Sequence, residues 1–171
     1  MDLMSIAQLL GNVGEFFGSI AVLVTLAYLT IQVRQNSNSI NSSNYFNAAT
    51  SYNTINALSI SDDETSRLMI KGTNTPEQLT EDESARYFLL LRAYNNNFMA
   101  VWWSHQNGTF PDEQFRVYER NFIQLVASPG GRTLLPTLSY DYPEYADYLE
   151  KRAAERGNTR WFRDRGYDTV D

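Results

Sequence analysis

The chain has no cysteine and only one histidine among its 171 residues. The lack of cysteine excludes disulfides, thiolate metal sites and a cysteine nucleophile. A di-metal carboxylate site in a helical bundle requires Glu-x-x-His on two helices, but Trp102 stands three positions before His105. We therefore expect no catalytic residues, no metal site and no bound cofactor, and we predict that the protein is not an enzyme.

Basic residues are in the minority, with 14 Lys and Arg against 20 Asp and Glu, and the net charge is −6. Binding to nucleic-acid phosphates requires a basic surface, so no nucleic-acid partner is expected. Acidic clusters at residues 62–64, 81–83 and 112–113 stand at the starts of predicted helices. Carboxylates there stabilise the helix dipole, and we interpret these clusters as structural.

No charged residue occurs from Phe16 to Val33, between Glu15 and Arg34. As a helix this run would be roughly 27 Å long, close to the hydrocarbon thickness of a bilayer. The alternative is a buried helix of a soluble core, but a helix in a small domain usually keeps a polar face. We predict that residues 1–35 form an anchor with one transmembrane helix, and that the lipid bilayer is a partner.

A row of small residues follows one side of this helix at spacings of four and three. Small residues let helix backbones approach closely, and close packing drives helix association in lipid. Spacing of this kind is typical of a left-handed helix crossing. We predict an interface with another transmembrane helix, either a second copy or a different protein, formed by Ala7, Gly11, Gly14, Gly18, Ala21 and Thr25.

The charges that flank the apolar run are acidic before it and basic after it. Asp2 and Glu15 precede the run, whereas secretory signal peptides carry Lys or Arg there, so no cleavable signal is expected. Arg34 follows the run, and the positive-inside rule places it in the cytoplasm. We expect a single-pass protein of the bacterial inner (cytoplasmic) membrane, with its C-terminal domain in the cytoplasm.

Glycine and proline are absent between Gly18 and Gly72, and no alternating apolar pattern typical of strands occurs in the chain. The anchor helix is predicted to continue, with a break near residues 36–42, into an amphipathic helix that ends near Ile60. The expected fold is all-α. It consists of an N-terminal transmembrane helix running into an amphipathic helix, followed by a bundle of about five helices, and the bundle domain covers residues 36–157.

Start and stop signals divide the bundle into helices. Thr80 and Glu83 form a Thr-x-x-Glu capping box, and Ser128–Arg132 is interpreted as a tight corner between helices. The first predicted helix runs from about residue 62 to Lys71 and ends at Gly72, and the second covers 81–106 and ends at Gly108. The next three begin at 111–113, at Ser128 and Pro129, and at Pro143, and the last of them ends at Arg156.

Aromatic residues are concentrated in the predicted helix over 81–106, where Tyr94, Phe98, Trp102 and Trp103 lie close together. Such a cluster is most often core, but it also suits a pocket for a flat or lipid-like ligand. Trp103 lies off the main apolar face and is expected at the surface. His105 is expected in or beside the core, with a hydrogen-bond partner rather than a catalytic role.

The C-terminal segment is basic and aromatic, and residues 158–171 are predicted to form a tail. One hypothesis is contact with the anionic cytoplasmic leaflet. The other is that Trp161 and Phe162 cover the bundle core while the arginines pair with acidic helices. The residues proposed for membrane-surface contact are Arg156, Arg160, Trp161, Phe162, Arg163 and Arg165.

Three segments resemble a family of small uncharacterised bacterial proteins. They are Gly11–Phe16, then Tyr28-Leu29 with Gln32–Asn36, and the Ser128–Arg132 corner. The resemblance is close over the anchor and loose elsewhere. It implies a bacterial, single-pass, membrane-anchored helical protein, and it supplies no functional residues.

Two functions remain open from the sequence. The first is a non-enzymatic, membrane-anchored accessory or scaffolding protein that associates through the small-residue row and the helical domain. The alternative is a membrane-tethered sensor or carrier that binds a small apolar ligand in an aromatic-lined bundle.

Overall fold

The computed structural model describes residues 2–157, and these residues are all-α, as predicted. They contain no strand, and the helices follow the expected order. The elements are α1 (Leu3–Ser59), α2 (Asp63–Asn74), the 3₁₀ helix η1 (Pro76–Gln78), α3 (Glu81–Gln106), α4 (Asp112–Val126), the 3₁₀ helix η2 (Gly131–Leu134), α5 (Leu135–Asp141) and α6 (Pro143–Arg156).

The chain divides into two compact units, Met1–Asn41 and Ser42–Asp171. Helix α1 contributes residues to both units and lacks the break predicted near residues 36–42. That expectation was wrong because Asn and Ser each cost a helix only a few tenths of a kcal/mol, and no Gly or Pro interrupts this segment. The Ser39 hydroxyl also donates to the Gln35 carbonyl at 3.0 Å, within the helix itself.

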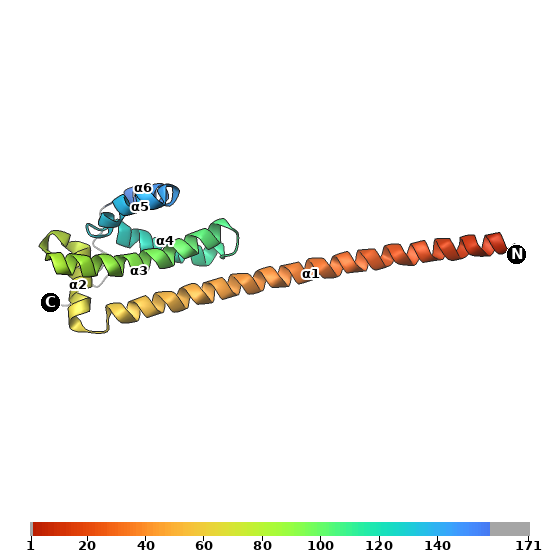
Figure 1. The fold of residues 1–171 in the computed structure, drawn as a ribbon, viewed down its shortest axis with the longest axis horizontal. Helices are drawn as coiled ribbons and strands as arrows, with labels where there is room; N and C mark the ends of the chain where they lie inside the picture. The colour runs from red at the N-terminus through yellow and green to blue at the C-terminus, as the bar shows by residue number, and fades with distance from the viewer. Residues whose placement is uncertain (1, 158–171) are drawn as a thin grey trace. The chain divides into compact units, whose positions relative to one another are not determined.

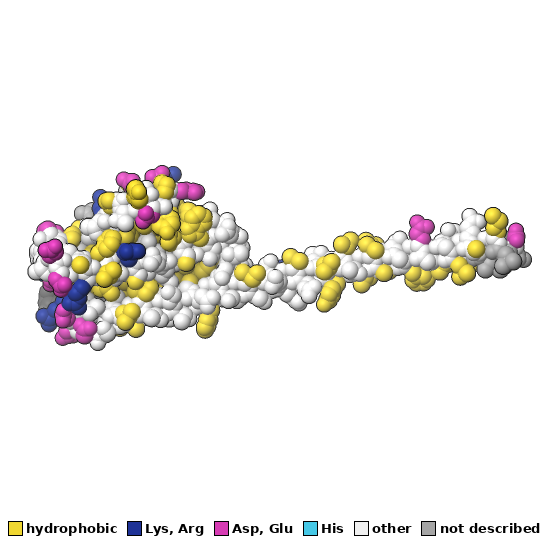
Figure 2. Space-filling view, in the orientation of Figure 1, with side chains coloured by type: hydrophobic (Ala, Val, Ile, Leu, Met, Phe, Trp, Pro, Cys, Tyr) yellow, Lys and Arg dark blue, Asp and Glu magenta, His cyan; other side chains and the backbone are white. Residues whose placement is uncertain are grey.

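In the first unit, large apolar side chains are exposed around the helix (Figure 2). Among the described residues, one helix is long and apolar enough to cross a membrane, and none of its most apolar window is buried. This helix is therefore a candidate membrane span, and its insertion in a bilayer stays a prediction. Charged side chains are concentrated on the second unit instead (Figure 2).

The second unit is a helical bundle in which α3 supplies much of the core. In this unit α3 and α4 lie side by side, as do α5 and α6 (Figure 1). The buried faces of α3, α4 and α6 form this core, and Ile55 of α1 joins it. The buried residues of α3 include Tyr87, Leu91, Tyr94, Phe98, Val101 and Trp102.

The predicted start of α3 is confirmed by its cap. The Thr80 side chain accepts from the Glu83 backbone N–H, and Glu83 accepts from the Thr80 N–H at 2.8 Å. Lys71 Nζ donates to Glu83 Oε2 at 2.7 Å, and this bond lowers the pKa of Glu83 below its usual value. The acidic clusters occupy the caps and first turns of α2, α3 and α4, as expected.

Two boundary predictions in the bundle were wrong, one at Gly72 and one at Ser128 and Pro129. Gly72 does not end α2, which continues to Asn74. Instead a Cβ at Gly72 would lie 2.3 Å from a ring carbon of Tyr87, so the glycine permits close packing of α2 on α3. Ser128 and Pro129 do not start an α-helix but form a turn before η2, and Ser128 Oγ accepts from the Gly131 N–H at 3.1 Å.

The Ser128–Arg132 segment is the tight corner that its sequence predicts. The Gly130 N–H donates to the Thr73 carbonyl at 3.0 Å, which joins the corner to α2. A Cβ at Gly131 would lie 1.9 Å from the Leu125 carbonyl oxygen, so the chain turns back tightly on the end of α4. Gly108 and Gly157 have positive φ, +67° and +78°, where the chain leaves α3 and α6.

Candidate functional site

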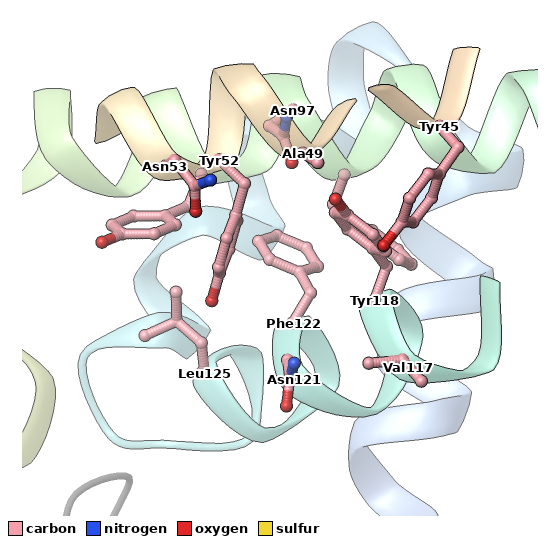
Figure 3. Close-up of a pocket in the computed structure, with 12 residues that line it drawn as sticks. Tyr45, Ala49, Tyr52, Asn53, Asn97, Val117, Tyr118, Asn121, Phe122 and Leu125 are labelled. Carbon is pink, nitrogen blue, oxygen red and sulfur yellow. The ribbon is translucent and has the colours of Figure 1, made fainter. Parts of the chain in front are cut away.

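A cavity of about 300 Å³ lies in the second unit between α1, α3 and α4. We call it the tyrosine pocket because tyrosines are the commonest residue in its lining (Figure 3). No charged side chain lines it among the described residues. The lining residues are Tyr45, Ala49, Tyr52, Asn53, Tyr94, Asn97, Phe98, Val117, Tyr118, Asn121, Phe122 and Leu125.

Helical periodicity brings the pocket residues together. Tyr45, Ala49 and Tyr52 are spaced four and three apart on α1, so they share one face. Tyr118 and Phe122 are four apart on α4 and reach toward α1 (Figure 3). Because Ala49 has only a methyl group between two large rings of its own helix, it leaves space at the centre of this face.

Contacts between rings hold the pocket walls. The ring centroids of Tyr52 and Tyr94 are 5.9 Å apart at 71°, and those of Tyr52 and Tyr118 are 5.9 Å apart at 70°. Phe98 and Phe122 stack with centroids 4.7 Å apart. Edge-to-face and offset arrangements of this kind are favourable for aromatic rings. The pocket therefore has well-packed aromatic walls.

Polar groups in the pocket are neutral and several already have partners. The Tyr94 hydroxyl donates to Asn56 Oδ1 at 2.8 Å, and Asn97 Nδ2 donates to the Ala48 carbonyl at 3.1 Å. Burial, with smaller contributions from Tyr45 and Tyr52, raises the pKa of Tyr118 to about 12. The phenol of Tyr118 is thus protonated near pH 7. Such a lining suits an uncharged, largely apolar ligand with one or two hydrogen-bonding groups.

A second cavity, of about 530 Å³, borders the same part of α1. Asn44, Ser51 and Ile55 of α1 line it together with residues of α3 and with Phe110. Asn44 Nδ2 donates to the Thr109 carbonyl at 2.9 Å. The part of α1 in the second unit therefore borders two cavities, each with its own set of α1 residues.

The aromatic cluster predicted on α3 is divided between two roles. Tyr94 and Phe98 line the tyrosine pocket. Trp102 instead packs in the core against Tyr145, with ring centroids 5.2 Å apart, while Trp103 is 46% exposed, as expected. The sequence reasoning missed Tyr45, Tyr52, Tyr118 and Phe122 as pocket residues, although their helical spacing, and the alanine between two tyrosines, was a usable signal.

His105 has the structural environment that was expected. Its Nε2 lies 3.0 Å from Asp112 Oδ1, and its ring stacks on Phe115 with centroids 3.8 Å apart. These contacts join the end of α3 to the start of α4. Within the described residues, no group of His, Asp or Glu is arranged to hold a metal ion.

The small-residue row is uncovered in the described part of the chain. A Cβ built at Gly11, Gly14 or Gly18 meets no other atom within 4 Å, apart from the helix backbone itself. The hydroxyls in the apolar run are satisfied internally: Ser19, Thr25 and Thr30 each donate to the carbonyl four residues earlier at 2.8 Å. The helix–helix interface stays a prediction, as does the contribution of Ala7, Ala21 and Thr25 to it.

Only the first of the proposed membrane-surface residues is described. Arg156 is exposed at the end of α6, and its Nη1 donates to the Arg120 carbonyl at 3.5 Å. Arg160, Trp161, Phe162, Arg163 and Arg165 lie outside the described residues. Both hypotheses for the segment 158–171 therefore stay predictions.

Comparison with known proteins gives no relative. Family models, curated proteins and solved structures were searched, and none matches this chain. The resemblance of the anchor segments and of the Ser128–Arg132 corner to a bacterial family stays a prediction.

Proposed function

We propose that this is a non-enzymatic, single-pass membrane protein that acts as an accessory or scaffolding subunit. The observation that carries the proposal is the charge-free run from Phe16 to Val33, whose apolar side chains are exposed. In water this exposed surface would be unfavourable, whereas in a bilayer it is favourable. The internally bonded hydroxyls of Ser19, Thr25 and Thr30 fit the same environment, because lipid offers them no partner.

The proposed partner of the anchor is another transmembrane helix. The uncovered glycines would let a second helix approach closely at Gly11, Gly14 and Gly18. The proposed location is the bacterial inner membrane, with the bundle in the cytoplasm, as Arg34 suggests.

A two-hybrid assay in bacterial membranes tests this function. Gly14→Leu and Gly18→Leu place large side chains in the row, and association is expected to be lost. Ala27→Leu is the matched control, because residue 27 lies nine positions after Gly18, on the other side of the helix. Association that survives both glycine substitutions would contradict the interface.

A second candidate function is supported by the tyrosine pocket. We propose that the bundle of a membrane-tethered sensor or carrier binds a small, uncharged, apolar ligand there. The supporting observation is a cavity of about 300 Å³ with aromatic walls and no charged lining residue among those described. This volume is at the lower end of ligand pockets in general, so a compact ring system is the best fit.

A further inference from the structure

The same five-residue pattern, Arg-x-x-Glu-Arg, occurs twice in the bundle, at residues 116–120 and 152–156. The first copy lies on α4 and the second on α6. All three charged positions of each copy line one cleft of about 400 Å³, which we call the arginine cleft. Helical spacing explains this, because residues i, i+3 and i+4 share a helix face. Two sequence-distant copies of the motif therefore face one another.

Both carboxylates of the cleft are bound by the same arginine. Arg152 Nε donates to Glu119 Oε1 at 2.7 Å, and Arg152 Nη1 donates to Glu155 Oε2 at 2.6 Å. The Tyr148 hydroxyl also donates to Glu119 Oε1, at 2.5 Å. Burial opposes ionisation of Glu119, but the bonds from Arg152 and Tyr148 outweigh it and lower its pKa. Glu119 is thus held in its charged form, and both glutamates already have an arginine partner.

The other three arginines have no such partner. Among the described residues, no carboxylate forms an ion pair with Arg116, Arg120 or Arg156. Arg156 donates only to a backbone carbonyl, that of Arg120. Four arginines against two glutamates give the cleft a charge of +2, on a chain whose net charge is −6. Within each copy the two arginines are four residues apart and repel one another, whereas the Arg152–Glu155 pair, three residues apart, is attractive.

We propose that the arginine cleft binds a phosphate group, carried either by a soluble phosphate ester or by a lipid headgroup. Guanidinium groups bind phosphate through paired N–H donors, and three of them are available around one cleft. Arg152 is bonded to both Glu119 and Glu155 and offsets part of their negative charge, which would otherwise repel an anion more strongly. This site is separate from the tyrosine pocket and from the membrane anchor, and it does not depend on either proposal.

Titration of pyrophosphate into the full chain, held in phosphatidylcholine nanodiscs, tests the site by calorimetry. Saturable binding is expected, and the triple substitution Arg116→Gln, Arg120→Gln and Arg156→Gln should weaken it by at least about tenfold. The matched control is Arg67→Gln, Arg92→Gln and Arg132→Gln, which removes the same charge from exposed positions elsewhere in the bundle and should leave binding nearly unchanged. A triple change to Lys in the cleft keeps the charge but loses the paired donors, and binding should be intermediate.

Nanodiscs that contain phosphatidylglycerol distinguish the two sources of phosphate. If lipid headgroups reach the cleft, pyrophosphate will bind more weakly there, and the cleft variant will lose this lipid effect. If the ligand is soluble, the apparent affinity will match that in phosphatidylcholine. Either result supports the site. Absence of saturable binding by the folded wild-type chain, or equal weakening by the control variant, would overturn it. Circular dichroism of each variant verifies that the helices remain folded.

Discussion

Gly130 and Gly72 are in such close contact that a Cβ on Gly130 would lie 1.9 Å from the Gly72 carbonyl oxygen. The same Cβ would lie 2.8 Å from the Tyr87 hydroxyl. The corner at Ser128–Arg132 thus packs backbone against backbone on α2, and α2 packs in turn on Tyr87 of α3. The Ser128–Arg132 corner, α2 and α3 are therefore held together at this contact.

Gly130→Ala is expected to destabilise the bundle by about 3 kcal/mol, because the added methyl must displace backbone rather than a flexible side chain. Thermal unfolding of the full chain in neutral detergent, followed by circular dichroism, would show a lower midpoint. Gly11→Ala is the control, since a Cβ there meets no other atom within 4 Å. Equal midpoints for Gly130→Ala and the wild type would show that the corner can relax.

The lowered pKa of Glu119 is expected to make the folded bundle less stable in acid. Its pKa in the folded chain lies below the ordinary value of 4.5, because Arg152 and Tyr148 donate to it despite its burial. A carboxyl whose folded pKa is lowered contributes stability that is complete above pH 4.5 and is lost as the pH falls through the lower folded value. Glu119→Gln should reduce stability by about 2 kcal/mol near pH 7 and flatten this acid slope.

Unfolding midpoints measured at several pH values, from neutral down to strongly acidic, would test that prediction. Glu150→Gln is a suitable control, because Glu150 is exposed on the same helix as Arg152. Its slope should match that of the wild type. If Glu119→Gln kept the full acid slope, other groups would be responsible for it.

Filling the tyrosine pocket is expected to prevent ligand binding. Ala49→Phe puts a ring into the space at the centre of the α1 face, so binding of naphthoquinone should weaken by at least about tenfold. Equilibrium dialysis of the full chain in detergent micelles measures this directly. Ala57→Phe makes the same change at an exposed position of α1 and should have little effect. A wild-type chain that retains no more naphthoquinone than empty micelles would contradict the pocket as a site for such rings.

Membrane insertion of the apolar run is testable by fractionation. The full chain is expected in the membrane pellet, released by detergent but not by alkaline carbonate. Val24→Lys places a charge near the middle of the run, at a cost of about 3 kcal/mol, and should shift protein to the soluble or degraded fraction. Asn36→Lys adds the same charge after Arg34, and should leave insertion intact. Wild-type protein that stays monodisperse in the supernatant would disprove the anchor.

Local signals in the sequence were sufficient for much of the fold. The capping box of Thr80 and Glu83 predicted the start of α3, because all of its hydrogen bonds lie within four residues. Helix α6 likewise runs from Pro143 to Arg156, as predicted. The exposure of Trp103, off the apolar face of α3, followed from helical spacing. In each case the residues that determine the feature lie within one or two helical turns of one another.

Features that depend on distant segments were not predictable in the same way. Gly72 resembles a helix end in the sequence, but its role is set by Tyr87, fifteen residues later. The spacing of Tyr45, Ala49 and Tyr52 puts them on one face of α1, but the tyrosine pocket also depends on how α1, α3 and α4 pack together. The repeated Arg-x-x-Glu-Arg motif was visible in the sequence, yet its meaning depends on α4 and α6 packing together. The role of Gly72, the tyrosine pocket and the arginine cleft are therefore each set by tertiary packing and not by helix propensity.

The two cavities that border residues 44–55 of α1 have a consequence for the order of unfolding. A helix with incomplete packing loses fewer favourable contacts when it separates from its neighbours than a fully enclosed one does. The amides of this segment should therefore exchange with deuterium sooner than those around Leu91 of α3, which is completely buried. In this partly open state the segment of α1 separates from α3 and α4, and the aromatic side chains of the tyrosine pocket become exposed. Reaching it requires only a fraction of the free energy of global unfolding.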